Sequence, residues 1–414
     1  MKIQFNRFLT RSLLTAALAG VTSIAAAATV EVYKSPTCGC CAKWVDHMRD
    51  NGFTVNVHDI GNDEARAEAG ILPELGSCHT ALVNGYAIEG HVPATNYGAR
   101  WLNAHVPDLQ GRTVDILQGF DTLEEYLRYY NFYGTIFGRV ANRIAEARFT
   151  LDGQTYHLTQ NVPGATLHGG PGGFHTKIWE VLESSDNHVV FQYISPDGEE
   201  GYPGELTARV TYTLVGSQSL RLDLEASSDQ ATPVNLAHHP FYNLAGHQTG
   251  HLKHHFFRVN ADYFYPMDEY FTIDEKKTPV DNSLFDLRKL RKIFPYLNDD
   301  HPQIQLAGGY DHNFELNDYR KGHLREAAHI WEETSGRSMK IHTTLPGMQF
   351  YTCNSSGGRP GKNQSQYPKW GSFCLEPQYF PNSPNVPSFP DTIVRPGNPI
   401  KDSVIYEFDQ QKSL

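Results

Sequence analysis

The chain has 414 residues, of which 40% are hydrophobic and 20% charged, so it has ample material for folded cores and lacks the composition of a disordered chain. It carries 46 Asp and Glu against 35 Lys and Arg, a formal net charge of -11, with no basic block after the first dozen residues. This balance argues against a nucleic-acid partner, because phosphate backbones are bound by clustered cations.

The first 28 residues predict a secretory signal peptide. Lys2, Arg7 and Arg11 precede an apolar segment, which is followed by small residues up to Ala27 and Ala28. The apolar segment is short for a membrane span, so we expect cleavage and no membrane attachment afterwards; an uncleaved N-terminal anchor is the alternative. The segment therefore predicts a periplasmic or secreted protein.

Residues 29–94 predict a small α/β unit with a thioredoxin-like opening. The segments TVEVY (29–33) and FTVNVHDI (53–60) alternate like strands, and the segment 42–50 between them has apolar residues at helical spacing. Further along, Asn84-Gly85 is a signal for a tight turn between two strands. Strand, cysteine-bearing turn, helix and strand follow one another in the order of a thioredoxin-like fold.

Four of the six cysteines lie in this first unit. Cys38 and Cys41 form a C-x-x-C motif at the expected start of the helix, where the helix N-terminus favours the thiolate. Such a density of thiolates suits a soft metal such as Cu(I), and thiol–disulfide exchange is a second use. A structural disulfide with a spare thiol is the alternative. The candidate metal ligands are Cys38, Cys40, Cys41, Cys78 and His79.

From Val30 to about Ala94 the chain resembles the periplasmic metal-binding family DUF411, which is associated with copper handling. The resemblance rests on the segments VYKSPTCGCCAKWVDHM and GSCHTALVNGYAIEGHVPA together with the strand between them. It implies a metal-binding unit that is truncated in this chain, because members of the family usually continue beyond this point.

Residues 95–414 predict a single large β-structure. Short alternating segments are separated by Gly, Asn, Asp and Pro, and no long amphipathic helix interrupts them. Strands at this density indicate a large antiparallel sandwich or barrel. The clearest segments are ARFTLDGQTYHL, VVFQYISPDG, ELTARVTYTLVGSQSLRLDLEASSD and SMKIHTTLPGMQFYTCN.

Two adjacent histidines stand in the strand-like segment VNLAHHPFYNL (234–244). Successive strand residues face opposite sides of a sheet, so His238 shares a face with apolar residues and His239 shares the other with Asn235 and Asn243. We therefore expect His239 to meet a polar ligand and His238 to be a hydrogen-bonded core residue. A purely structural role for both remains the alternative.

Further polar residues occur in glycine-rich or apolar surroundings. Glu376 lies in an apolar strand context, where a carboxylate needs a partner or a function. An ion pair of Arg143 with Glu376 and a turn cap by Asp311 are the structural alternatives. Metal binding by His168, His239 and Asp311 lacks the usual close spacing, and no G-x-S-x-G elbow supports a serine hydrolase. Paired acid-base catalysis by a carboxylate and a histidine is the remaining chemistry.

Nearly the whole of residues 95–414 resembles the aldose 1-epimerase, or galactose mutarotase, family. Ten segments match in order: TNYGA, LQGFDTLEEYL, FGRVANRIAEARFTLDGQTYHL, LHGGPGGF, DGEEGYPG, VNLAHHPFYNLAG, GGYDHNF, TTLPGMQFYTCN, FCLEPQYFPNSPN and TIVRPG. The resemblance implies a mainly β fold, a galactose mutarotase-like supersandwich. It also implies interconversion of the α and β anomers of free hexoses such as galactose and glucose, without a cofactor.

The same resemblance implies roles for particular residues. Glu376 would be the general base at the anomeric hydroxyl, and His239 the general acid at the ring oxygen. The residues implied to bind the sugar hydroxyls are Asn142, Arg143, His168, Asp311 and Gln349. The chain departs from the family pattern in two places. Around the catalytic position it has His238 before and Pro240-Phe241-Tyr242 after. The cysteine-bearing unit of residues 29–94 stands where the family usually has its first strands.

The sequence leaves a second function open. In that alternative the protein is a non-catalytic periplasmic copper carrier, and its β-sandwich binds sugar without turnover or only folds. Loss of mutarotation in Glu376→Gln would support the enzyme, whereas Cu(I) binding that depends on Cys38 without mutarotation would support the carrier.

Overall fold

The computed structural model describes residues 29–36, 45–46, 49, 54–68, 79–83, 86–89, 94–129, 131–185, 187–216, 218–355 and 357–413. The chain divides into two compact units, Met1–Gly90 and His91–Leu414, and each is described by itself. Within these ranges, no helix has the length and apolar character needed to cross a membrane.

The first unit contains a four-stranded sheet in the order β2-β1-β3-β4. Strand β1 (Thr29–Lys34) pairs in parallel with β2 (Thr54–His58) and antiparallel with β3 (His79–Val83), which pairs antiparallel with β4 (Tyr86–Glu89). Val83 lies opposite Tyr86, so a two-residue connection joins β3 to β4, as the Asn-Gly signal predicts. Helix α2 spans Asp63–Glu68. The helix expected over residues 42–50 lies mostly outside the described residues, and the thioredoxin-like fold stays a prediction.

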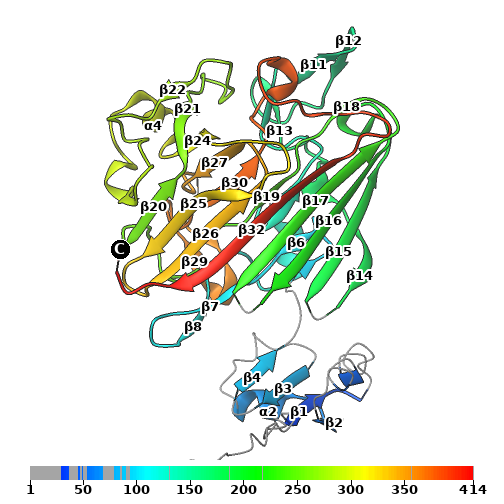
Figure 1. Ribbon diagram of the computed structural model, residues 1–414, viewed down its shortest axis with the longest axis vertical. Helices are drawn as coiled ribbons and strands as arrows, with labels where there is room; N and C mark the ends of the chain where they lie inside the picture. The colour runs from blue at the N-terminus through cyan, green and yellow to red at the C-terminus, as the bar shows by residue number, and fades with distance from the viewer. Residues whose placement is uncertain are drawn as a thin grey trace, which may run out of the picture. The chain divides into compact units, whose positions relative to one another are not determined.

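The second unit is built on a nine-stranded antiparallel sheet, whose long strands run side by side in Figure 1. Strands β16, β17 and β32 alternate buried with half-buried or exposed residues, so one face of the sheet is apolar and the other meets solvent. In sheet order the strands are β14 (Glu180–Ser184), β15 (His188–Ser195), β16 (Leu206–Val215), β17 (Ser219–Ser228), β32 (Ile400–Gln410), β26 (Arg337–Thr343), β25 (Arg325–Glu332), β20 (His255–Val259) and β23 (Arg291–Lys292).

A five-stranded antiparallel sheet packs its apolar face into the same hydrophobic core. In order it contains β22 (Thr278–Pro279), β21 (Ala261–Tyr265), β24 (Asp311–Leu316), β27 (Gly347–Tyr351) and β30 (Cys374–Gln378). Phe257 of the nine-stranded sheet contacts Phe350 of the five-stranded sheet, with ring centroids 5.2 Å apart. The strand density had predicted such a mainly β, antiparallel architecture, and the structure confirms it.

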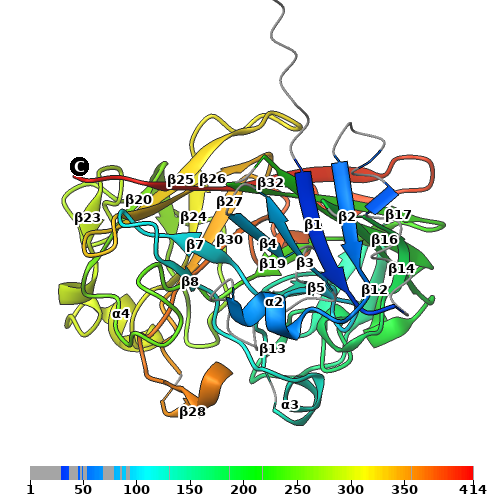
Figure 2. The same cartoon turned by 90° about the horizontal axis from the view of Figure 1, so that it is seen from below.

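Short elements close the remaining sides of this unit, and Figure 2 shows α3 and β28 on the side away from β25 and β32. The α-helices are α3 (Leu123–Arg128) and α4 (Pro302–Ala307). The strands are β5 (Ala94–Thr95), β6 (Arg100–Trp101), β7 (His105–Pro107), β8 (Thr113–Asp115), β9 (Thr135–Phe137), β10 (Arg143–Ala145), β11 (Arg148–Leu151), β12 (Gln154–His157), β13 (Ala165–Leu167), β18 (Thr232–Pro233), β19 (Ala237–His239), β28 (Arg359–Pro360), β29 (Gln366–Tyr367) and β31 (Ile393–Val394). The 3-10 helices are η2 (Phe174–Thr176), η3 (Glu199–Gly201), η4 (Phe294–Tyr296), η5 (Lys362–Gln364) and η6 (Ser383–Asn385).

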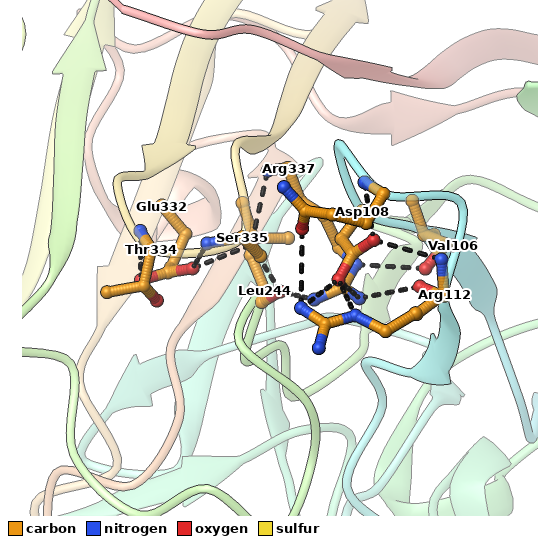
Figure 3. A network of polar contacts seen from close by, with 9 residues as sticks. Val106, Asp108, Arg112, Leu244, Glu332, Thr334, Ser335 and Arg337 are labelled. Atoms are coloured by element: carbon orange, nitrogen blue, oxygen red, sulfur yellow. Dashed lines mark hydrogen bonds and ion pairs between the residues drawn. The ribbon is translucent and has the colours of Figure 1, made fainter.

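A buried arginine fastens the β7–β8 hairpin to the large sheet (Figure 3). The Arg337 guanidinium donates to the backbone carbonyls of Val106, Leu244 and Arg112 at 2.9, 2.9 and 3.1 Å. Its charge lies 4.0 Å from the Asp108 carboxylate, and both side chains are almost fully buried. Val106 and Arg112 belong to the hairpin and Leu244 to the segment after β19, so the Arg337 side chain joins both to β26.

The segment 234–244 departs from the sequence prediction, because its ladder is short. Only Ala237–His239 forms a strand, β19, which pairs with β9. Pro240 follows directly and has no backbone N–H to continue the ladder. The face assignment is nevertheless confirmed: His238 lies among Trp101, Tyr212 and Tyr406.

Candidate active site

The candidate site lies on the face of the five-stranded sheet that turns away from the hydrophobic core. Phe350 and Leu375 face the core, and their strand neighbours Gln349 and Glu376 therefore face the other side. Gln349 lies opposite Glu376 in the register of β27 and β30. Asp311 on β24 accepts a hydrogen bond of 2.7 Å from Nε2 of Gln349. Strand alternation thus lines up polar groups from three adjacent strands.

His239 of β19 lies against this polar face. Its Nε2 is 3.2 Å from Oε1 of Glu376, and its Nδ1 is 3.6 Å from the sulfur of Cys374. The rings of Phe137 and Phe241 hold the imidazole at centroid distances of 4.9 and 4.8 Å. The histidine and the carboxyl are 4% and 2% exposed, so the pair is screened from bulk water while it still borders a cavity.

A third group of polar side chains comes from the ends of β10 and β13. Asn142 and His168 have left-handed backbones, with φ of 59° and 53°, and bind each other reciprocally. The Asn142 N–H donates to Nδ1 of His168 at 3.1 Å, and the His168 N–H donates to the Asn142 carbonyl at 2.8 Å. The neutral ring of His168 therefore carries its proton on Nε2. Its face stacks on Phe137 at 3.6 Å, which fixes the direction of that donor.

These three groups surround one cavity of about 390 Å³. Its volume is in the range of roughly 300–1,000 Å³ that is usual for small-molecule sites. The residues that the sequence singled out and that line it together are Asn142, Arg143, His168, His239, Asp311, Gln349 and Glu376. The structure thus places all seven at one site.

Other lining residues were missed by the sequence reading. They are Asn131, Phe132, Tyr133, Leu167, Phe241, Phe271, Ala307, Tyr351, Asn354, Ser355 and Arg359. Most lie in loops or at strand ends, where no periodic pattern indicates which way a side chain points. Tyr351 was accessible to the strand argument, because it stands two residues after Gln349 and shares its face.

Burial changes the proton affinity of the central pair. Desolvation raises the pKa of Glu376 well above its ordinary value, and the neighbouring Asp311 carboxyl adds to the rise. Desolvation also lowers the pKa of His239 to about 3. The two shifts favour a protonated carboxyl beside a neutral imidazole, so the pair shares one exchangeable proton. One group can then give a proton while the other takes one.

Two side chains that line the cavity, Arg143 and Asp311, are of opposite charge type and form no ion pair with each other in the described structure. Burial lowers the pKa of the Arg143 guanidinium and raises that of the Asp311 carboxyl. The Arg143 guanidinium stacks on the ring of Phe271 at 5.0 Å. In the described part of the chain, no ion pair links Arg143 with Glu376, so the ion-pair alternative is not supported.

Several polar residues from the sequence reading have structural places instead. His238 forms a hydrogen bond of 3.0 Å with the Tyr406 hydroxyl. In the segment FGRVANRIAEARFTLDGQTYHL, Arg139 donates to Ser195 and to the Pro203 carbonyl and does not line the cavity. Asp311 begins strand β24 and its carboxylate accepts from Gln349 of the neighbouring strand, which does not support the turn-cap alternative. The candidate thiol ligands Cys38, Cys40, Cys41 and Cys78 lie outside the described residues, as does the side chain of His79. Elsewhere in the described ranges no cluster of three potential metal ligands occurs.

Comparison with known proteins agrees with this geometry. The family model described as aldose 1-epimerase matches residues 87–407. The chain is 41% identical over 318 residues to human galactose mutarotase, covering 77% of this chain and 90% of the relative. It is 34% identical over 319 residues to aldose 1-epimerase from Escherichia coli K12, covering 77% and 91%.

Solved structures give the same result for the fold. An aldose epimerase homologue from C. elegans superimposes with a TM-score of 0.71 at 26% identity, covering 80% of this chain and 95% of that chain. A galactose 1-epimerase from Lactobacillus acidophilus superimposes with a TM-score of 0.65 at 25% identity, covering 80% and 94%. The family match over most of the sequence and the shared fold lead to one conclusion: the chain belongs to the aldose 1-epimerase family.

Proposed function

We propose that the second unit interconverts the α and β anomers of free hexoses such as galactose and glucose. The observation that carries this proposal is the buried contact of 3.2 Å between Nε2 of His239 and Oε1 of Glu376, at the wall of a polar cavity. Ring opening of a cyclic aldose needs one group that removes a proton and one that supplies a proton, and this pair holds a single exchangeable proton.

The proton on the Glu376 carboxyl crosses the 3.2 Å contact to Nε2 of His239, which leaves a carboxylate beside an imidazolium. The carboxylate takes the proton of the anomeric hydroxyl while the imidazolium protonates the ring oxygen O5. The C1–O5 bond breaks and an open-chain aldehyde forms. Rotation about C1–C2 and closure by the reverse transfers give the other anomer. Each turnover returns both protons, so no co-reactant is consumed.

The remaining polar side chains bind the sugar hydroxyls. His168 supplies the Nε2–H donor left by its contact with Asn142, Arg143 supplies guanidinium donors, and Asp311 supplies acceptor oxygens. Gln349 holds Asp311 at 2.7 Å, and its own amide oxygen is buried without a partner in the described structure. A polyhydroxylated ring would satisfy these groups from several sides, whereas an apolar ligand would leave them unpaired.

Polarimetry of freshly dissolved α-galactose tests the proposed reaction. We expect the approach to equilibrium rotation to be faster with purified protein than in buffer, since mutarotation also proceeds spontaneously. Heat-denatured protein at the same concentration is the control for non-specific acid-base catalysis. An identical rate with folded protein and with buffer would overturn the proposal. A panel of aldoses in the same assay gives the preferred substrate.

We propose further that the protein is exported and that its first unit is a thioredoxin-like metal-binding module. The order β2-β1-β3-β4, with one parallel and two antiparallel pairs, supports a thioredoxin-like fold. The signal-like residues 1–28 support a periplasmic or secreted location. Cys38, Cys40, Cys41, Cys78 and His79 would bind Cu(I), although epimerisation itself needs no cofactor.

A competition titration of the whole protein with a Cu(I) chelator tests this second proposal. We expect one Cu(I) to be retained by the wild type and lost by Cys38→Ser, with mutarotation unchanged in both. No retention under reducing conditions would contradict it. Retention without any mutarotation would favour the alternative of a copper carrier with an inactive sugar-binding sandwich.

A further inference from the structure

We propose that Cys374 is a positioning residue for His239: its sulfur accepts the Nδ1–H of the imidazole and thereby leaves Nε2 as the atom that exchanges a proton. The inference rests on the proposed function, because it assigns a role within the same proton transfer. It concerns a residue that does not line the cavity.

The geometry places a sulfur, a ring and a carboxyl in one line of contacts. Cys374 and Glu376 stand two residues apart on β30 and share a face, and the imidazole of His239 lies against both. The distances are 3.6 Å from Nδ1 to the sulfur and 3.2 Å from Nε2 to Oε1. The Cys374 side chain is fully buried, so water does not compete for the nitrogen. The rings packed around the imidazole orient its plane, and the backbone carbonyl of His239 itself is a further acceptor.

The tautomer decides whether the proposed transfer can occur. An imidazolium that gives the proton of Nε2 becomes a neutral ring with its proton on Nδ1, and the return step needs the Nε2 lone pair. The opposite tautomer would place N–H on Nε2 and would have no lone pair there for the returning proton. An acceptor beside Nδ1 therefore stabilises the tautomer that the cycle needs.

A thiol differs from the carboxylate that often fills this place. Burial raises the pKa of Cys374 well above its usual value, so the group remains a neutral thiol. A neutral acceptor orients the ring and stabilises the positive charge of the imidazolium less than a carboxylate would. The imidazolium then stays a strong acid, which is what protonation of a weakly basic ring oxygen requires. Cys374 thus orients the ring of His239, while the proton affinity of Nε2 in that ring stays low.

Nitrogen NMR of the wild-type protein tests the tautomer directly. The protein is labelled with ¹⁵N-histidine, and the His239 signals are assigned by their loss in His239→Gln. We expect a protonated Nδ1 and an unprotonated Nε2 in the neutral ring. A neutral ring protonated on Nε2 would overturn the inference, whatever the activity of the sample. The result also separates this inference from the proposed function, because an inactive protein can still show the expected tautomer.

Variants at Cys374 test the consequence for catalysis. Removal of the acceptor in Cys374→Ala should lower kcat for α-galactose about tenfold, the lower end of what loss of an orienting partner costs, and should leave KM unchanged. Cys374→Ser retains an acceptor and should recover most of that loss. Cys353→Ala, which removes a buried thiol from the same hydrophobic cluster, is the matched control and should keep wild-type kcat. Equal kcat in Ala and wild type, or equal losses in Ala and Ser, would overturn the inference; if Cys374→Ala does not fold, the wild-type tautomer decides.

Discussion

The two sheets of the second unit divide stability and chemistry between them. In the nine-stranded sheet, β17 alternates, with its leucines and Ala226 in the core and polar residues on the other face. In the five-stranded sheet, β30 is buried on both faces, yet Glu376 and Gln378 on its outer face are polar. Burial of polar side chains on the outer face of the five-stranded sheet is unfavourable for folding, because buried polar groups need hydrogen-bond partners.

Polar atoms without a partner also occur on this outer face. Buried side-chain atoms without a hydrogen-bond partner in the described structure include Oε2 of Glu376, Oε1 of Gln349 and both amide atoms of Asn313 and Gln378. All four residues stand on the outer face of the five-stranded sheet. A polar face that is covered but incompletely paired is suited to receive a ligand. Changes to the two sheets should therefore separate activity from stability.

The largest effect is expected for Glu376→Gln on the five-stranded sheet. Loss of the proton acceptor should lower kcat on the order of 10³-fold, within the range for acid-base groups. The folded pKa of Glu376 is raised, so stability is lost as pH rises from the unfolded value toward the folded one. The amide removes that cost, and urea unfolding at pH 8 should show a free energy of unfolding at least equal to that of the wild type. Undiminished polarimetric rates would contradict the assignment of Glu376.

The converse is expected for Leu222→Ala on the nine-stranded sheet. Leu222 of β17 is fully buried in the main core, and its truncation should lower the free energy of unfolding by about 3 kcal/mol. Urea denaturation followed by circular dichroism measures this change. The kcat of the folded fraction should equal that of the wild type. A loss of kcat without a loss of stability would break the proposed separation of the two sheets.

A smaller effect is expected for Asp311→Asn. The amide keeps the shape of the side chain but is a weaker acceptor for sugar hydroxyls, so KM for galactose should rise about tenfold with little change in kcat. Asp223→Asn is the matched control, because Asp223 lies on β17 and pairs with Arg221 at the surface. Initial rates over a range of sugar concentrations give both constants. Equal shifts of KM in the two variants would speak against a binding role for Asp311.

A gradual effect, spread over several pH units, concerns acid stability. Burial lowers the pKa of both His238 and His312 from 6.5 to about 3. The unfolded chain therefore binds protons that the native state does not, and the free energy of unfolding should fall as pH falls from about 6.5 toward 3. Each such histidine contributes up to roughly 1.4 kcal/mol per pH unit. In His312→Leu one titrating group is removed, so the slope of the free energy of unfolding against pH should decrease by about 1.4 kcal/mol per pH unit between pH 6 and 4. An unchanged slope would contradict the burial of His312 as a neutral side chain.

Much of the fold could be predicted from alternation alone. The segments 205–229 and 338–354 read as pairs of strands, and the structure forms β16, β17, β26 and β27 there. The segment 234–244 was read as too long a strand, because tertiary contacts and Pro240 limit its ladder to three residues. The antiparallel order of the sheets depends on contacts between distant segments, which a local pattern does not contain.

The candidate site was accessible to the sequence in part. Parity distinguished His239 from His238, and the family resemblance brought together residues from six separate segments. Phe271 and Arg359 were not found, because they lie in irregular segments whose side-chain directions are set by the surrounding fold. Cys374 could have been found from its spacing to Glu376, since residues two apart on a strand share a face.

The alternation along β30 has a consequence for how this gene can vary in length. Cys374, Glu376 and Gln378 face the site, whereas Leu375 faces the core. Insertion or deletion of a single codon within β30 would turn the acid-base carboxyl into the core and expose a leucine to the cavity. The connection between β27 and β30 faces no such parity constraint and can change length. Insertions and deletions in functional relatives should therefore occur in that connection and be absent from the strand.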